Sequence, residues 1–269
     1  MGKIISVTNQ KGGVGKTTTS INLAACLALS GRKVLLIDID PQGNASSGLG
    51  VTLERDQKGI YELLENGASL NQVIYSTDIE TLKVIPSNVD LAGAEIELVG
   101  SENREKVLSR VLAAVDTQYE FVIIDCPPSL GLLTLNALAV SQSVLIPMQC
   151  EYYALQGLNH LLKTLKRVKK SINPGLKVEG ILLTMYDNRT LLAGQVEDQV
   201  KKYFSEFLMK TIIPRNIRLS EAPSHGKPIV LYANRSKGSD SYIELAQEVI
   251  QRTKREIVNP EQQQTERVI

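Results

Sequence analysis

The chain has 269 residues, of which 43% are hydrophobic and 22% charged, and its formal net charge is +1. The hydrophobic content excludes an intrinsically disordered chain, and the length is enough to bury one large core. The near-neutral balance excludes a protein that binds nucleic acid through bulk charge, so any such binding must come from local patches. No run of about 18 apolar residues occurs, so we expect no membrane-spanning helix.

Cysteine, histidine and tryptophan usage narrows the chemistry further. The three cysteines (Cys26, Cys126 and Cys150) lack CxxC spacing, and there are only two histidines, which gives little support to a structural zinc site. Without a secretory signal peptide, we expect free thiols in a cytoplasmic protein. His160 and His225 are expected to be structural or solvent-facing. The absence of tryptophan argues against base stacking on an aromatic platform.

Apolar strand-like runs alternate with helical periodicities along the chain. The first strand is predicted at residues 3–8, and a helix follows over 17–30, where Gly31 ends the apolar pattern as a C-cap would. Further strands are expected at residues 34–37, 81–86, 121–124, 143–147, 178–185 and 209–213. Further helices are expected at residues 59–74, 101–116, 130–139, 154–171, 190–206, 218–223 and 240–257. This alternation predicts an α/β fold with a doubly wound, mostly parallel sheet.

A glycine-rich loop, residues 10–18, joins the first strand to the first helix. Its end, Gly15-Lys16-Thr17, fits the phosphate-binding pattern G-x-x-x-x-G-K-[ST], and Gln10 stands where that pattern has its first glycine. Glycines let such a loop turn its backbone N–H groups toward a polyphosphate, and the following helix adds its N-terminal dipole. The pattern predicts Lys16 on the β- and γ-phosphates and the Thr17 hydroxyl on Mg²⁺. The expected nucleotide contacts in the loop are Lys11, Gly12, Gly13, Val14, Gly15, Lys16, Thr17 and Thr18.

A second lysine, Lys11, lies at the mouth of the same loop, five residues before Lys16. The short loop already presents Lys16 to the γ-phosphate, so Lys11 is better placed to reach a nucleotide on a neighbouring subunit. The loop contains no arginine finger, and Lys11 could supply the equivalent positive charge in trans. We therefore expect ATP hydrolysis to be weak until two subunits meet around nucleotide.

Three aspartates follow apolar strands, at the edge of the sheet where ligands bind in open α/β folds. Asp125 ends Phe-Val-Ile-Ile-Asp and can reach the Mg²⁺ shell, either directly or through water. Asp40 is the better candidate to orient the attacking water, and we also place it near the metal. Asp38 lies deeper and ranks lower, as a structural or supporting group.

Three segments together resemble the ParA/MinD family of deviant Walker A ATPases, and within it the chromosomal ParA proteins: the loop at 10–18, Asp40-Pro-Gln-Gly-Asn, and Ile-Ile-Asp125-Cys-Pro-Pro. The resemblance runs from the first strand to about residue 255. It implies a P-loop NTPase fold, here a single ATPase domain over residues 1–257, followed by a polar tail over 258–269.

The resemblance also implies residue roles. Such proteins form ATP-sandwich homodimers in which Lys11 matches the lysine that contacts the partner's nucleotide. Lys16 matches the lysine needed to bind ATP, and Asp40 the residue needed for hydrolysis. Gly12 matches the glycine whose enlargement blocks close approach of the subunits. The adenine-contacting positions of the family correspond to Met185, Pro214 and Asn216.

For partners, the resemblance implies that the ATP dimer binds double-stranded DNA without sequence preference, with Arg189 and Arg218 at the family's DNA-contacting positions. Arginines there can bridge phosphates, and dimerisation doubles a patch too weak alone. A basic N-terminal segment of a DNA-bound ParB-type centromere-binding protein stimulates hydrolysis in this family. We thus expect a cytoplasmic, nucleoid-associated protein acting in chromosome or plasmid partitioning.

Three other functions remain as alternatives. A MinD-like membrane-cycling ATPase needs a basic amphipathic C-terminus, whereas residues 258–269 carry a proline, two glutamates and no aromatic residue, so no stable membrane association is expected. A metabolic ATP-dependent synthase of the same superfamily needs further catalytic groups, which the sequence does not reveal. A pure interaction protein with a degenerate nucleotide site conflicts with the intact set of Lys16, Thr17, Asp40 and Asp125.

Overall fold

A seven-stranded sheet forms the centre of the structure, a computed structural model that describes residues 2–65, 67–100, 102–113 and 118–258. The strand order is β3-β4-β2-β5-β1-β6-β7, and every neighbouring pair is parallel except β3 with β4. The strands are β1 (Lys3–Val7), β2 (Val34–Asp38), β3 (Tyr75–Ser76), β4 (Leu82–Ile85), β5 (Phe121–Asp125), β6 (Ser143–Gln149) and β7 (Lys177–Thr184). The predicted doubly wound, mostly parallel sheet is confirmed.

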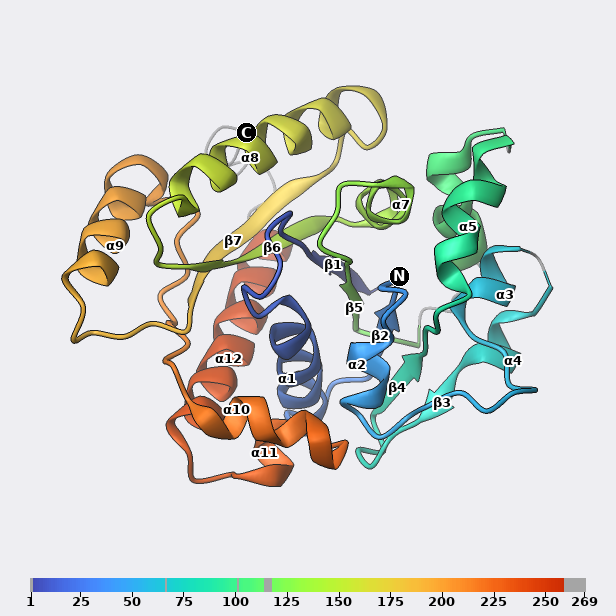
Figure 1. Cartoon of the computed structure of the whole chain (residues 1–269), viewed down its shortest axis with the longest axis horizontal. Helices are drawn as coiled ribbons and strands as arrows, with labels where there is room; N and C mark the ends of the chain where they lie inside the picture. The colour runs from blue at the N-terminus through green and yellow to red at the C-terminus, as the bar shows by residue number, and fades with distance from the viewer. Residues whose placement is uncertain (1, 66, 101, 114–117, 259–269) are drawn as a thin grey trace.

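Helices cover both faces of the sheet (Figure 1). On one face, α1 packs against α12, with α10 and α11 beneath them; on the other lie α5, α7 and α8. The helices are α1 (Lys16–Leu29), α2 (Asn44–Ser47), α3 (Ile60–Leu64), α4 (Leu70–Val73), α5 (Leu91–Glu97), α6 (Val107–Leu112), α7 (Leu132–Val140), α8 (Ala154–Ser171), α9 (Leu191–Phe204), α10 (Ile217–Glu221), α11 (Ile229–Tyr232) and α12 (Lys237–Val258). This two-sided cover explains why β1, β2 and β5 are buried at every residue and read as unbroken apolar runs.

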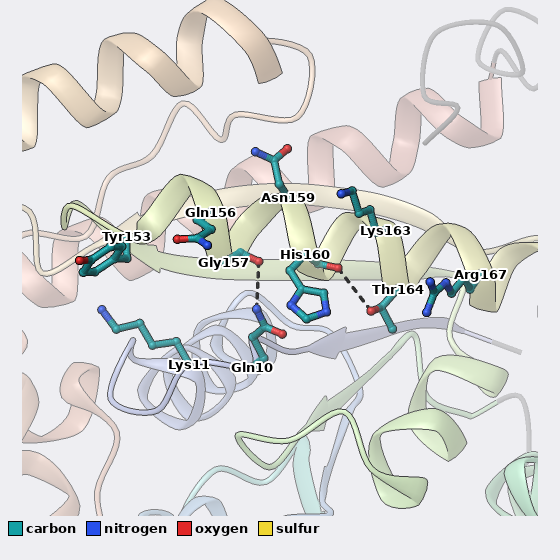
Figure 2. Close-up of a pocket in the computed structure, with 10 residues that line it drawn as sticks. All are labelled: Gln10, Lys11, Tyr153, Gln156, Gly157, Asn159, His160, Lys163, Thr164 and Arg167. Atoms are coloured by element: carbon teal, nitrogen blue, oxygen red, sulfur yellow. Dashed lines mark hydrogen bonds between the residues drawn. The ribbon is translucent and has the colours of Figure 1, made fainter.

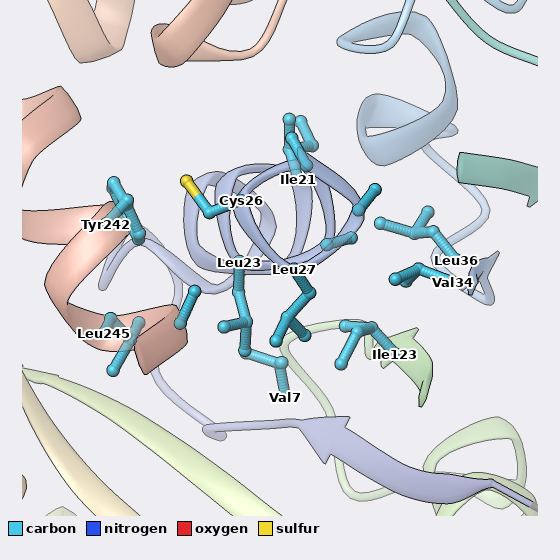
Figure 3. Packing of buried hydrophobic residues seen from close by; sticks show 14 of the residues in the cluster. Val7, Ile21, Leu23, Cys26, Leu27, Val34, Leu36, Ile123, Tyr242 and Leu245 are labelled. Atoms are coloured by element: carbon cyan, nitrogen blue, oxygen red, sulfur yellow. The ribbon is translucent and has the colours of Figure 1, made fainter. Parts of the chain in front are cut away.

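Helix α1 lies in the largest core cluster, packed against the sheet and beside α12. Figure 3 shows Leu23 and Leu27 directed toward the sheet, while Tyr242 of α12 packs beside the helix. Gly31 follows the helix with φ +85°, a left-handed conformation that glycine adopts without strain, as expected of a C-cap. The core therefore fixes the first turn of α1, which carries Lys16 and Thr17, against the centre of the sheet.

The predicted strand at 209–213 is wrong. Isolated bridges flank this segment, at Leu208 with Ile181 and at Pro214 with Tyr186. Within it, the N–H groups of Met209 and Ile213 each donate to a β7 carbonyl at 2.9 Å, but no regular strand forms. The carboxylate of Glu248 on α12 accepts the N–H groups of Lys210 and Thr211, each at 3.0 Å. At Lys210 and Thr211, hydrogen bonds to the Glu248 side chain thus take the place of regular strand pairing.

Two predicted helices are also corrected. Residues 59–74 form two short helices, α3 and α4, because Ser69 and Gln72 build a capping box that starts a new helix. In the described part of 101–116, a 3₁₀ turn at Arg104–Lys106 precedes the shorter α6. The sequence patterns missed the short elements α2, β3, α5 and α11. The predicted tail, 258–269, lies outside the described residues except for Val258, the last residue of α12.

No helix in the described ranges is long and apolar enough to cross a membrane.

Candidate active site

The loop at 10–18 connects β1, in the middle of the sheet, to the N-terminus of α1. Gly13 and Gly15 have φ of +72° and +84°, left-handed values that a side chain would strain. The loop is anchored by buried Val14, whose carbonyl accepts a hydrogen bond from the Thr184 hydroxyl at 2.8 Å. Gln149 at the end of β6 donates its amide to the Gly13 carbonyl at 3.2 Å. These contacts hold the loop in an open, ring-like conformation, in which backbone N–H groups can surround an anion.

Lys16 points into this ring. Its side chain is buried, and Nζ donates to the Lys11 carbonyl at 3.1 Å. Burial lowers the pKa of Lys16, although the charges of Asp125 and Asp40 act in the opposite direction. In the part of the chain that the structure describes, no carboxylate forms an ion pair with this buried ammonium, so it is suited to an anionic ligand.

Asp125 lies beneath the loop and links β5 to α1. Its Oδ2 accepts the Thr17 hydroxyl at 2.9 Å, and its Oδ1 accepts the Ser20 hydroxyl at 2.7 Å. Burial, with the nearby Asp38 charge, raises the pKa of Asp125 to about 8. The sequence prediction had placed Thr17 and Asp125 at one metal site, and the fold brings their oxygens into contact; Ser20 was missed because its role depends on tertiary contact.

Hard oxygen donors of this kind fit Mg²⁺. The described residues contain no group of three or more His, Cys, Asp or Glu side chains that could hold a metal by themselves. An ion here would complete its shell with phosphate oxygens and water, which is how Mg²⁺ is usually held beside nucleotides.

Asp38 and Asp40 separate into two environments at the end of β2. Asp38 is fully buried and accepts the Ser46 N–H and hydroxyl at 2.8 and 2.7 Å, which ties β2 to α2. Burial raises the pKa of Asp38 to about 6. Asp40 accepts one hydrogen bond, from the Gln42 N–H at 3.0 Å, so among the described residues its other oxygen has no protein donor. The hydrogen bonds of Asp38 fit the structural role expected of it, and the expectation that Asp40 orients the attacking water stays a prediction.

Lys11 lies outside the ring that Lys16 enters. Its side chain is 44% exposed and pairs with Glu151, just beyond β6. Figure 2 shows the Lys11 side chain extended at the loop mouth. Sequence reasoning missed Glu151 and Gln149, which only the pairing of β6 with β1 brings to the loop.

A cavity of about 400 Å³ lies beside the loop, between the ends of α1 and α12 and the segment after β7. Its lining includes Gly15 and Thr18 of the loop together with Met185, Pro214 and Asn216, so the structure gathers the three residues expected at the adenine. Met185 has a backbone φ of +49°, a left-handed conformation that is strained for a residue other than glycine. Its Sδ lies 2.6 Å from the amide nitrogen of Gln149. The cavity is thus continuous with the phosphate loop through Gly15 and Thr18.

The two predicted DNA-contacting arginines lie on neighbouring segments. Arg189 is 83% exposed and forms a two-pronged pair with Asp187, at 2.8 and 2.6 Å. Arg218 is 56% exposed and pairs with Glu221 at 2.8 Å. The Arg215 N–H donates to the Tyr186 carbonyl at 3.0 Å, which brings the two segments together. Arg215 is exposed, has no ion-pair partner among the described residues, and was missed, although its place beside Pro214 was a usable signal.

Comparison with known proteins gives one consistent family. Residues 2–178 match the family model described as "AAA domain". The chain is 59% identical over 249 residues to the sporulation initiation inhibitor protein Soj of Bacillus subtilis, covering 93% of this chain and 98% of that protein. It is 54% identical to the chromosome partitioning protein ParA of Myxococcus xanthus, covering 94% and 89%. A solved structure of cobyrinic acid a,c-diamide synthase from Mycobacterium smegmatis, with bound ADP and magnesium, superposes with a TM-score of 0.82 at 37% identity, covering 94% and 96%.

Proposed function

The chain belongs to the ParA/MinD family of ATPases, alongside the chromosomal ParA proteins, and on that premise we propose that it is an ATP-dependent dimerising switch for DNA partitioning. ATP with Mg²⁺ binds in the loop at 10–18, with adenine in the cavity that Met185, Pro214 and Asn216 help to line. The ATP dimer binds double-stranded DNA without sequence preference, and a ParB-type protein stimulates hydrolysis. The protein thereby acts in the cytoplasm, on the nucleoid.

The separation of the two loop lysines is the observation that carries this proposal. Lys16 is buried inside the phosphate loop, whereas Lys11 is exposed at the mouth of the same loop. The loop therefore directs one ammonium group toward its own phosphate site and a second ammonium group toward the protein surface. An outward ammonium adds nothing to the protomer's own phosphate site. On a second subunit's nucleotide, it would stabilise charge that develops during phosphoryl transfer.

Each residue of the site has its own role in ATP hydrolysis. Lys16 and the loop N–H groups bind the phosphates, and Thr17 with Asp125 holds Mg²⁺, which neutralises phosphate charge. Asp40 orients the attacking water near the metal, consistent with its open carboxylate oxygen. Until a second subunit brings Lys11, the site lacks one positive charge, so we expect basal turnover to be weak.

Size-exclusion chromatography and DNA binding, each with and without ATP and Mg²⁺, test the proposal. The parent should become a DNA-binding dimer with ATP, and Lys16→Ala should remain a monomer. Asp40→Ala should accumulate as an ATP-dependent dimer, because it binds ATP without hydrolysing it. Arg189→Ala should dimerise but bind DNA weakly. An Asp40→Ala protein that stays monomeric overturns the role of Asp40, and a parent dimer that ignores DNA at low salt overturns the partitioning function.

The 37% identity to the synthase structure is the observation that favours an ATP-dependent synthase instead. The identities of 59% and 54% to the partitioning relatives outweigh it. ATP turnover separates the two functions: DNA with a ParB-type protein should raise turnover in a partitioning ATPase, whereas a synthase would respond to a carboxylic acid substrate with an amide donor.

A further inference from the structure

A second, larger hollow lies on the other side of the loop mouth, and of its lining residues the function proposed above uses only Lys11. It is a groove of about 950 Å³ between the start of the phosphate loop and α8. The loop contributes Gln10 and Lys11; α8 and the residue before it contribute Tyr153, Gln156, Gly157, Asn159, His160, Lys163, Thr164 and Arg167 (Figure 2). The span from residue 153 to 167 corresponds to about 20 Å of helix, the length of roughly six extended residues.

The lining is basic and contains no carboxylate. Lys163 and Arg167 are four residues apart, so they lie on one face of α8, and both are exposed. Within the described ranges neither side chain has an ion-pair partner, whereas Lys11 at the other end is already paired with Glu151. The uncompensated charge of the groove is therefore concentrated at the Lys163–Arg167 end.

The opposite end offers an aromatic surface. Tyr153 is 69% exposed and stacks edge-on against Tyr152, with ring centroids 5.0 Å apart. Between this end and the cations lie the amides of Gln156 and Asn159, which can hydrogen-bond to a peptide backbone. A tyrosine anchor followed by amides and then cations matches an extended segment with an apolar residue at one end and carboxylates at the other.

We propose that this groove is a docking site for a short acidic segment of a partner protein. A second copy of this chain does not fit, because a two-fold contact between α8 helices would bring Lys163 and Arg167 against themselves. The basic segment expected of a ParB-type stimulator has the wrong charge for it. A DNA duplex meets flat or protruding cationic surfaces, whereas these cations line a hollow.

A segment bound here would contact the phosphate loop directly. The Gln10 amide donates to the Gly157 carbonyl of α8 at 3.2 Å, and Gln10 precedes Lys11 in the loop. Figure 2 shows His160 and Thr164 on the same side of α8 as Gln10. The docked segment would therefore lie against the residues that enter the nucleotide loop, in a position to sense whether the loop is occupied.

Fluorescence anisotropy on the nucleotide-free protein tests the proposal, so its failure is distinct from a failure of dimerisation or DNA binding. The probe is a labelled peptide of about eight residues, with leucine followed by glutamates and aspartates; its Gln/Asn counterpart is the uncharged control. The parent should bind the acidic probe, and binding should weaken as salt increases. The double variant Lys163→Glu/Arg167→Glu should weaken binding by at least about tenfold.

Lys166→Glu/Lys170→Glu is the matched control, because it makes the same charge change at the same spacing on α8 outside the groove. It should retain binding within about threefold, with thermal unfolding confirming that both variants fold. If both double variants lose the same affinity for the acidic peptide, binding depends on the overall charge of the helix and not on the groove, and the proposal is overturned. A parent that ignores the acidic probe, or one that binds a short DNA duplex through Lys163 and Arg167 instead, would also overturn it.

Discussion

Asp125 carries the most perturbed carboxyl group near the loop. Its side chain is fully buried, and within the described ranges it accepts hydrogen bonds from two hydroxyl groups, those of Thr17 and Ser20. Two hydroxyl bonds do not compensate the loss of water around a carboxylate, so burial raises its pKa to about 8. The same residue is proposed to face Mg²⁺, whose charge would favour the ionised form.

This burial makes stability depend on pH. Without metal, folded Asp125 keeps a proton that the unfolded chain releases near its ordinary pKa of 3.8. The folded state then binds more protons, so its free energy of unfolding falls as pH rises from about 4 to about 8, by up to about 1.4 kcal/mol per unit. Urea unfolding at several pH values in EDTA should show this decline. Asp125→Asn should flatten it above about pH 6, where Asp38, whose pKa burial raises to about 6, no longer contributes. If the free energy of unfolding falls equally steeply with pH in the parent and in Asp125→Asn, the titrating proton belongs to another residue.

Glycines in the loop differ in what a side chain would meet. A Cβ at Gly12 has nothing within 4 Å, and its backbone is not left-handed, whereas Gly13 has φ +72°. Gly12→Val should therefore fold with a stability within about 1 kcal/mol of the parent and bind ATP. It should fail to form the ATP dimer, since the added bulk faces the open loop surface that a partner would approach. Gly13→Val should instead lose about 1–2 kcal/mol from backbone strain. Calorimetry and sizing distinguish them; a Gly12→Val dimer would contradict the expectation.

At the scale of elements, α12 fixes the irregular segment that follows α9. Glu248 accepts the N–H groups of Lys210 and Thr211, and Arg252 donates to the Leu208 and Glu179 carbonyls. Burial alone would raise the pKa of Glu248, but these N–H donors and Arg252 lower it on balance. The pair thus replaces strand hydrogen bonds and leads the chain into the wall of the adenine cavity.

Removing the Glu248 carboxylate should destabilise the folded protein. Glu248→Ala leaves two N–H groups without their acceptor and the largely buried Arg252 without its ion-pair partner, so we expect a loss of about 2–4 kcal/mol in urea unfolding. Nucleotide affinity should fall as well, because Pro214 and Asn216 follow the released segment. Glu244→Ala, one turn earlier and exposed, is the control and should change stability by less than about 0.5 kcal/mol. Similar losses in both variants would show that helix α12 as a whole, rather than the carboxylate, is responsible.

The elements also show what the sequence could predict. Strands buried on both faces and ending in Asp125 were visible as unbroken apolar runs, and the loop was visible as a spacing of glycine, lysine and threonine. The segment at 209–213 has the same apolar character, but nothing in its own residues indicates that Glu248 occupies its N–H groups. Glu151 and Gln149 were hidden for the same reason, because tertiary pairing alone brings them to the loop.

At the scale of the whole molecule, cations from two segments meet on one side of the adenine cavity. The bridge between Tyr186 and Pro214 holds together the segments that carry Arg189 and Arg215, and Arg218 follows in α10. Arg189 and Arg218 are partly neutralised by Asp187 and Glu221. One protomer therefore offers only a weak patch to phosphates, which is consistent with a requirement for two.

Salt dependence measures how many of these cations meet DNA. The logarithm of DNA affinity should fall linearly with that of salt concentration, with a slope of about 0.9 per phosphate contact. A substitution removes one cation from each subunit of the ATP dimer, so Arg189→Ala or Arg218→Ala should reduce the slope by up to about 2. Arg215→Ala should act similarly, because among the described residues the Arg215 guanidinium forms no ion pair that DNA binding would have to break. Arg110→Ala, an exposed arginine on α6 with no part in this patch, should leave the slope unchanged. If Arg110→Ala lowers it as much as the others, DNA binding follows net charge, and the patch is not the DNA-binding surface.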